Sequence, residues 1–229
     1  MAIEHHFIGG LAPESSLWAP TRSRSGKPKW SLVHLGQAEL DGGCGLFCLL
    51  MSLMILLGLS RSEVLKLTSA KRGPLAALWR EARTHYFQGT DGKDLIQDVA
   101  AFGGALSVER HSGSAARIVK AATAAVLASQ APLLRVVGRD FDHWVLLSGI
   151  ERLHLAGDTY RTLALLALDP GERPPFLSAH TGRIDIEPRV HRRTAQQVSS
   201  RSYSYRSLSG DCVNVRLTEL LVLRLAQAP

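Results

Sequence analysis

Residues 37–59 read QAELDGGCGLFCLLMSLMILLGL, and this stretch decides the expected fold. From Leu46 to Gly58 the segment is apolar on every side, which predicts a central helix without a solvated face. Cys44 lies between glycines at the point where this helix begins. The N–H groups and partial positive charge of a helix N-terminus stabilise an anion. Because a thiol attacks a carbonyl only as the thiolate, Cys44 is the candidate nucleophile.

The pattern around this helix predicts helices first and strands later. Further helices are expected after the caps at Ser60 or Ser62 and within 74–86, 94–102 and 115–127. Short apolar runs predict strands at 105–110, 133–137, 144–150 and 162–168, and 213–225 should be a strand or a strand followed by a helix. This order is typical of an α+β fold, in which the helical half packs on a C-terminal antiparallel β-sheet.

The chain is expected to hold one main domain with two less regular segments. Residues 1–30 are rich in Gly, Pro, Ser and Arg and predict an irregular N-terminal arm, which leaves 31–229 as the catalytic domain. Residues 171–210 are polar and without periodicity, and they predict a long basic loop.

A histidine and an aspartate complete the expected chemistry. His143 stands where the strand at 144–150 begins, and Asp169 follows the strand at 162–168. If those strands pair antiparallel, Asp169 lies beside His143 and orients its ring, while His143 acts as general base. The side-chain amide of Gln37 could join the backbone N–H of Cys44 as an oxyanion hole.

These residues, in this order, resemble the papain-like cysteine peptidases. The nucleophile segment 37–49 is most similar to that of the bacteriocin-processing, double-glycine peptidases (family C39), in which a Gln precedes an acidic-Cys-Gly segment that enters a helix. His143-Trp144-Val145-Leu146-Leu147 resembles that family's His-aromatic-Val-Val-Leu strand, and Asp169-Pro170 its closing Asp-Pro. A weaker likeness joins residues 89–103 to its Gly-Thr-helix-Gly segment.

The resemblance implies a papain-like fold and a role for each matching residue. Cys44 would be the nucleophile, His143 the general base and acid, Asp169 the orienter and Gln37 the oxyanion donor. Contacts to substrate are expected from Gly43, Gly45 and Trp144. The chain departs from the family in four ways. The interval between Gln37 and Cys44 is one residue longer, residues 71–88 lengthen the helical half, and the hairpin from His143 to Asp169 is longer. The transporter segments of the family are not seen in this sequence.

Several alternatives stay open at this point. The same thioester chemistry serves a glutamine deamidase or transglutaminase-type effector, and a catalytically inactive binding module is a third reading. Cys48 is expected in the core rather than in the chemistry. Asp142 and Asp140 could compete with Asp169 as orienter, although a solvated position is favoured for Asp142. His34 and Glu39 stand near the nucleophile segment and could tune it, but surface positions are favoured for both.

The composition of the chain limits which binding partners and which cellular location are expected. The chain has 229 residues, three cysteines and a formal charge of +7, so no disulfide framework is expected. No signal peptide is visible and the longest apolar run is short for a membrane span, which predicts a cytoplasmic protein or one exported without such a signal. A peptide or protein substrate, no cofactor and no metal are expected. The basic and aromatic stretch 189–206 could contact an acidic partner or cover the substrate, and nucleic-acid binding is disfavoured.

Overall fold

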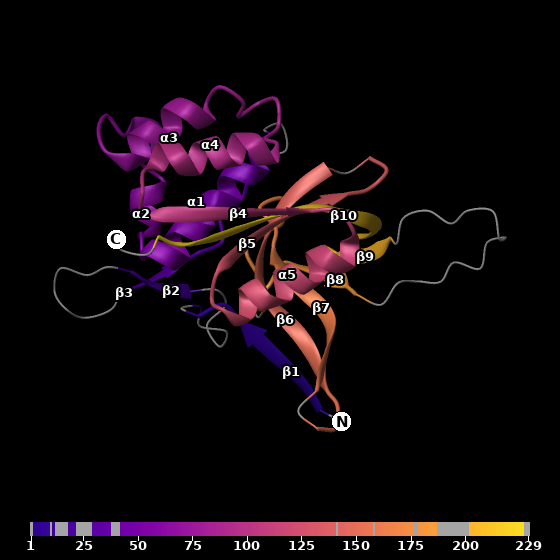
Figure 1. Ribbon diagram of the computed structural model, residues 1–229. Helices are drawn as coiled ribbons and strands as arrows, with labels where there is room; N and C mark the ends of the chain where they lie inside the picture. Colours follow the sequence, from indigo (N-terminus) through magenta and orange to yellow (C-terminus); the bar gives the residue numbers. More distant parts are fainter. Residues whose placement is uncertain are drawn as a thin grey trace.

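The computed structural model describes residues 2–9, 11, 18–21, 29–37, 42–140, 142–157, 159–175, 178–186 and 202–226. Its helices are α1 (Cys44–Leu57), α2 (Arg61–Val64), the short 3₁₀ helix η2 (Leu67–Ser69), α3 (Pro74–Ala82), α4 (Gly92–Phe102) and α5 (Ala115–Leu127). Its strands are β1 (Ala2–Phe7), β2 (Trp18–Thr21), β3 (Lys29–Leu32), β4 (Leu106–Ser112), β5 (Ala131–Val137), β6 (Asp142–His154), β7 (Tyr160–Leu168), β8 (Gly182–Asp185), β9 (Tyr203–Ser207) and β10 (Cys212–Leu225). The protein is therefore a mixed helix-and-strand fold, and α1 to α4 gather on one side of the strands (Figure 1).

Helix α1 is the buried axis of the helical side. Every residue of α1 is buried except Phe47 and Leu56. Its C-cap is Gly58 at φ 62°, a left-handed conformation that glycine adopts at low cost. The helix packs against β6 and β5 on one side and against α4 on the other. The predicted helix without a wet face is therefore confirmed, and it places Cys44 against the strands.

The predicted antiparallel sheet is present, and it closes into a barrel. Strands β5 to β10 form a ring in the order β6-β5-β10-β9-β8-β7, and the ring is completed by the pairing of β7 with β6. The two long strands β6 and β10 make this possible, since each pairs with different neighbours along its length. Strand β4 pairs with the end of β10, and α5 packs against the barrel (Figure 1).

Two strands correct the expectation of a long loop over 171–210. Strand β8 pairs with β7, and β9 pairs with β8 and β10. Both strands are short, and their buried positions Ile184, Tyr203 and Tyr205 are separated by serine and arginine, so the apolar signal is weak. Residues 187–201, which include most of the basic stretch 189–206, lie outside the described residues.

The expectation of an irregular arm over 1–30 is also wrong in part. Strand β1 pairs antiparallel with the second half of β6, from Ala2 opposite His154 to Phe7 opposite Gly149. Strands β2 and β3 pair with each other. Strand β1 lies at an edge and is only half-buried, so its polar sequence AIEHHF lacks the alternation of an interior strand. The rest of this arm lies outside the described residues.

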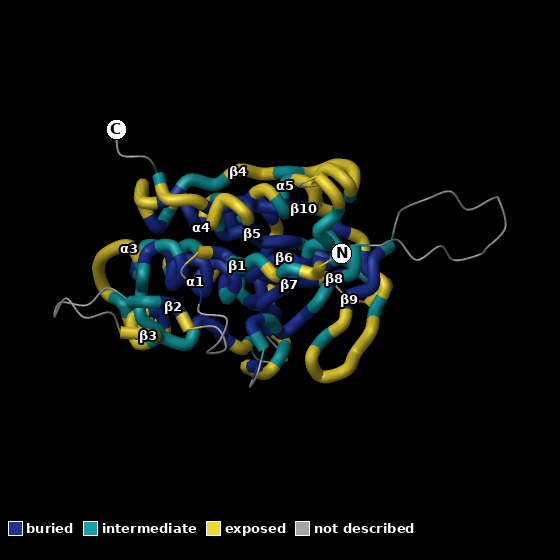
Figure 2. Tube along the Cα trace, turned by 90° about the horizontal axis from the view of Figure 1, so that it is seen from below, coloured by how far each residue is buried: buried dark blue, intermediate teal, exposed yellow. Residues whose placement is uncertain are grey.

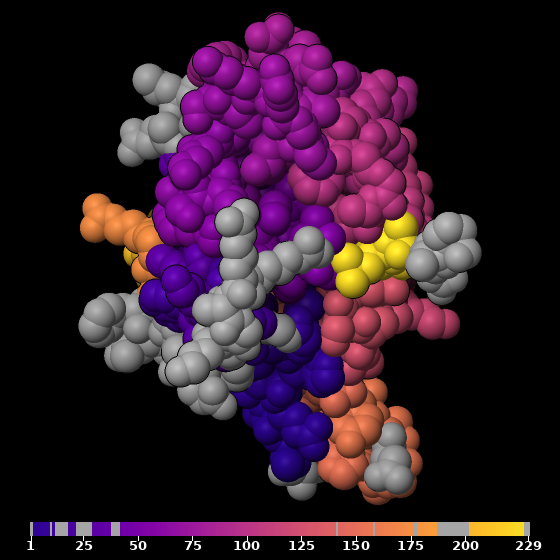
Figure 3. Space-filling view, turned by 90° about the vertical axis from the view of Figure 1, so that its left-hand side faces the viewer, coloured from indigo at the N-terminus to yellow at the C-terminus, as the bar shows by residue number. Residues whose placement is uncertain are grey.

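The remaining elements follow the sequence pattern closely. Helix α5 occupies the predicted range, α3 ends at Ala82 rather than at residue 86, and the 213–225 segment is strand throughout. Figure 2 shows burial concentrated in α1 and the barrel strands, with β4 and α3 more exposed. In Figure 3 the helices form the upper part of the surface and β1 runs below them. None of the described helices has the length and apolar character that crossing a bilayer requires.

Candidate active site

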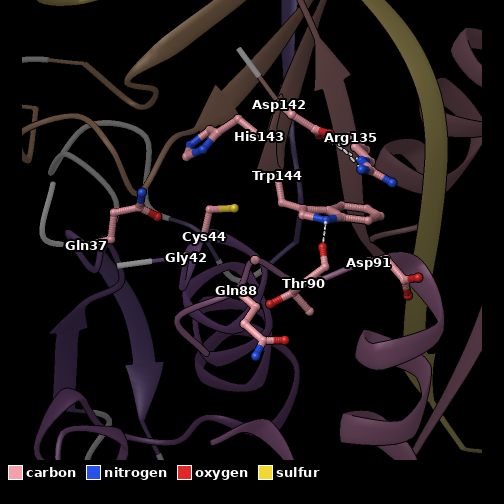
Figure 4. Close-up of a pocket in the computed structure, with 11 residues that line it drawn as sticks. Gln37, Gly42, Cys44, Gln88, Thr90, Asp91, Arg135, Asp142, His143 and Trp144 are labelled. Carbon is pink, nitrogen blue, oxygen red and sulfur yellow. Dashed lines mark hydrogen bonds and ion pairs between the residues drawn. The ribbon is translucent and has the colours of Figure 1, made fainter. Parts of the chain in front are cut away.

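Cys44 is the first residue of α1. The first backbone hydrogen bond across this turn runs from the N–H of Phe47 to the carbonyl of Gly43, at 2.9 Å. No side chain at the N-cap position Gly43 satisfies the N–H groups of the first turn. Cys44 is 8% exposed, and its sulfur faces a pocket (Figure 4). The thiol therefore lies where a helix N-terminus stabilises negative charge.

His143 reaches the same pocket from the start of β6. Its Nε2 donates a hydrogen bond of 2.5 Å to Oδ1 of Asp169, and its side chain is also hydrogen-bonded to Cys44. Because Nε2 is occupied by Asp169, Nδ1 is the nitrogen that serves the sulfur. The pairing of β6 with β7, with Leu146 opposite Leu168, brings the two residues together as the sequence predicted.

The imidazole of His143 is held in its charged form. Burial lowers its pKa, but hydrogen bonds to Asp169 and Cys44 outweigh burial and raise the pKa to about 10. Burial likewise raises the pKa of Asp169, and its bonds to His143, Tyr205 and Gly171 outweigh this, so the pKa falls below its ordinary value. At neutral pH the pair is therefore an imidazolium next to a carboxylate, with the sulfur on the opposite side of the ring.

Asp169 is fixed by hydrogen bonds from several elements. Its Oδ1 also accepts a 2.7 Å hydrogen bond from the N–H of Gly171, and its Oδ2 accepts one from the hydroxyl of Tyr205. Its own N–H donates to Oγ1 of Thr181 at 2.6 Å. His34 donates through Nε2 to the carbonyl of Asp169 at 2.9 Å.

Sequence reasoning missed three of these partners. Tyr205 and Thr181 fall in the stretch interpreted as a loop, where the alternation Tyr-Ser-Tyr was the only signal of a strand. His34 was expected at the surface and is instead fully buried. Burial lowers its pKa, so the ring is neutral and acts as a structural donor.

Gln37 lies on the opposite side of Cys44 from Trp144 (Figure 4). Its backbone N–H donates to the carbonyl of Pro170 at 2.7 Å, which ties it to the Asp169 turn. Its side-chain oxygen is buried and has no hydrogen-bond partner in the described part of the chain. A half-turn of the terminal amide exchanges its oxygen and nitrogen, so the same position can present the NH₂ group to a substrate oxygen.

The pocket has a volume of about 370 Å³, within the range of small-ligand sites. The buried ring of Trp144 forms one wall and donates from Nε1 to the carbonyl of Thr90 at 2.8 Å. The far end carries charged groups, where Asp142 accepts two hydrogen bonds from Arg135 at 2.7 and 2.8 Å. The pocket therefore runs from the thiol along an indole to an ion pair (Figure 4).

The glycines around Cys44 occupy three different environments. Gly43 is the N-cap of α1, and Gly45 packs towards α4, where an added Cβ would lie 3.2 Å from Cδ2 of Leu95. Neither is among the residues lining the pocket, and their contact with substrate stays a prediction. Gly42 does line it, and an added Cβ there would lie 2.8 Å from Cα of Gly89. A glycine is needed at 42 because two backbones meet there.

The competing candidates Cys48 and Asp142 are held by other partners. Cys48 is fully buried and donates through its thiol to the carbonyl of Trp144 at 3.3 Å. Burial raises the pKa of Cys48, so this thiol stays protonated. Asp142 is paired with Arg135, and Asp140 is exposed. Of the described carboxylates near His143, Asp169 is the one bonded to its ring.

Comparisons with known proteins add no assignment. No protein-family model matches this chain, and no curated protein is significantly similar to it. The site itself is a thiol at a helix N-terminus, a charged imidazole, a bound carboxylate and a nearby amide. Such a group is suited to acyl transfer through a thioester.

Proposed function

We propose that this protein is a papain-like cysteine peptidase that acylates Cys44 with a peptide or protein substrate. One observation carries the proposal: the thiol of Cys44 shares a hydrogen bond with His143, whose Nε2 is bonded to Asp169 at 2.5 Å. A buried cysteine without a catalytic role has no need of a charged imidazole.

The proposed mechanism uses each group once in acylation and again in hydrolysis. The Cys44 sulfur attacks the substrate carbonyl carbon, and the negative charge that forms on oxygen is held by the Cys44 backbone N–H and the Gln37 amide. The C–N bond breaks as His143 gives its proton to the leaving amine. A water molecule then loses a proton to His143 and attacks the thioester, which releases the acid and the thiol.

The papain-like assignment has structural support beyond these residues. Cys44 opens a buried helix that packs against β6, and His143 and Asp169 come from the paired strands β6 and β7. This arrangement agrees with the resemblance in the sequence, in which a nucleophile helix meets an antiparallel sheet. The succession of Gln37, Cys44, His143 and Asp169 along the chain agrees with it as well.

The test is selective labelling followed by turnover. In the full chain, iodoacetamide should modify Cys44 faster than exposed Cys212, because the charged imidazole favours the thiolate. Candidate substrate proteins would then be incubated with wild type and with Cys44→Ala and analysed by mass spectrometry. Cleavage by wild type alone supports the peptidase. Labelling of Cys44 no faster than Cys212 contradicts it.

The same experiment distinguishes the peptidase from the two alternative functions, a deamidase or transglutaminase and an inactive binding module. A labelled Cys44 that releases ammonia from glutamine side chains and cuts no peptide bond would assign a deamidase or transglutaminase. An unreactive Cys44 in a protein that still binds a partner would assign a binding module. Both readings use the same pocket, so the readout is chemical rather than structural.

A further inference from the structure

Tyr205 projects from β9 onto the carboxylate of Asp169. Its hydroxyl donates to Oδ2, while Oδ1 accepts from His143 and from the N–H of Gly171. Each oxygen of the carboxylate therefore has its own donors. Rotation of the carboxylate about its Cβ–Cγ bond would break bonds on both sides at once.

The absence of a side chain at Gly182 leaves room for the phenol of Tyr205 inside the barrel. Gly182 on β8 lies under the ring, and a Cβ added there would be 2.5 Å from the Tyr205 hydroxyl and 2.8 Å from the ring carbon that bears it. Tyr205 is only 3% exposed. Any larger residue at 182 would displace the hydroxyl from Asp169, so the glycine and the tyrosine act together.

We propose that Tyr205 is a positioning residue of the candidate active site, which holds Oδ2 of Asp169 so that Oδ1 stays aligned with Nε2 of His143. The inference rests on the proposed thiol chemistry of Cys44. Tyr205 is not among the residues that line the pocket; its hydroxyl is bonded to Asp169, and it acts on the nucleophile through Asp169 and then through the imidazole.

The phenol of Tyr205 stays protonated, and so remains able to donate to Asp169, over a wide pH range. Burial and the neighbouring carboxylate raise the pKa of Tyr205, so the phenol remains a donor. Its hydrogen bond stabilises the ionised form of Asp169 and helps to lower the pKa of that group. The other titratable groups facing this carboxylate are His143 on β6, neutral His34, and protonated Cys48 on α1. Glu172 lies in the turn that follows Asp169 and acts on Tyr205.

The test is the pH dependence of Cys44 alkylation in Tyr205→Phe. Loss of the hydroxyl removes a donor from the ionised carboxylate and raises the pKa of Asp169, so the carboxylate takes up a proton at a higher pH. We expect the acid limb of the iodoacetamide rate to move up by about one pH unit, so that the rate at a fixed pH on that limb falls about tenfold. The rate is read as mass change of the Cys44 peptide in the full chain.

Two further variants make the result specific. Tyr203→Phe removes a hydroxyl from the same strand at the same 3% exposure, but Tyr203 lies beside α5 rather than on Asp169. It should leave the pH profile unchanged. Gly182→Ala keeps every chemical group of the site and displaces the phenol, and it should reproduce the shift. It also carries the test if Tyr205→Phe fails to fold.

Each outcome has a separate meaning. A shared shift in Tyr205→Phe and Gly182→Ala, absent from Tyr203→Phe, supports the inference. An unshifted profile in a folded Tyr205→Phe, or an equal shift in Tyr203→Phe, overturns the inference alone. A wild-type Cys44 that reacts no faster than Cys212 overturns the proposed function and the inference with it.

Discussion

The two sides of the candidate active site differ in how firmly they are held. On the base side, Asp169 is bonded through both carboxylate oxygens and both backbone groups, to residues from four separate parts of the chain. On the nucleophile side, the first turn of α1 has no side-chain cap, and the Gln37 amide oxygen has no partner among the described residues. The Asp169 side is therefore held in place by its own partners, whereas the N–H groups in the first turn of α1 have no side-chain acceptor at the N-cap.

The largest expected effect comes from breaking the base side at its centre. Asp169→Asn keeps the shape of the side chain but removes the charge that supports the imidazolium. We expect acylation of Cys44 by p-nitrophenyl acetate to slow by about 10²- to 10⁴-fold. Asp142→Asn is the matched control, since Asp142 pairs with Arg135 instead, and it should retain most of the rate. Equal losses in both variants would contradict the assigned orienter.

The next effect tests the nucleophile side. Gln37→Ala removes the proposed side-chain oxyanion donor and should reduce kcat by about 10²-fold or more while leaving KM nearly unchanged. Gln88→Ala is a suitable control, because Gln88 lines the same pocket. Steady-state kinetics with a cleaved peptide would measure both. A change confined to KM would assign Gln37 to binding rather than to charge stabilisation.

A third variant tests the close backbone contact between Gly42, which precedes α1, and the segment that contains Tyr86 and Gly89. Gly42→Ala would place a Cβ 2.9 Å from the carbonyl of Tyr86, so one of the two loops must move. We expect a loss of about 1–3 kcal/mol in the free energy of unfolding, measured by denaturant titration. Gly104→Ala has open space around it and should cost less. Indistinguishable values would show that the 42–89 contact is not tight in solution.

The smallest effect is a pH dependence of stability. His143 has a pKa raised from 6.5 to about 10 in the folded protein, so it contributes stability that is complete below pH 6.5 and is lost as pH rises towards 10. Thermal unfolding of wild type and His143→Gln should therefore differ most near pH 6. The difference should shrink by about 1 kcal/mol or more by pH 10. A constant difference across this range would contradict a charged imidazole.

The sequence predicted the placement of the candidate site residues better than the architecture that surrounds them. Cys44, His143 and Asp169 were located because each lies at the end of an apolar element, where pattern and function coincide. Tyr205, Thr181 and the burial of His34 were missed because they depend on pairing between distant strands. Barrel closure is equally nonlocal, since β8 and β9 are short and only their neighbours make them strands.

Closure of the barrel also sets an order of events during folding. Helix α1 forms from contiguous residues early in the chain, but β10 must pair with the distant strand β5 as well as with β9 before the ring is complete. Pairings across such sequence separations form slowly. A growing chain would thus contain the nucleophile long before Tyr205 and β10 are available to secure the base. The arrangement of His143, Asp169 and Tyr205 around the thiol would therefore be completed only after the last strands have been made.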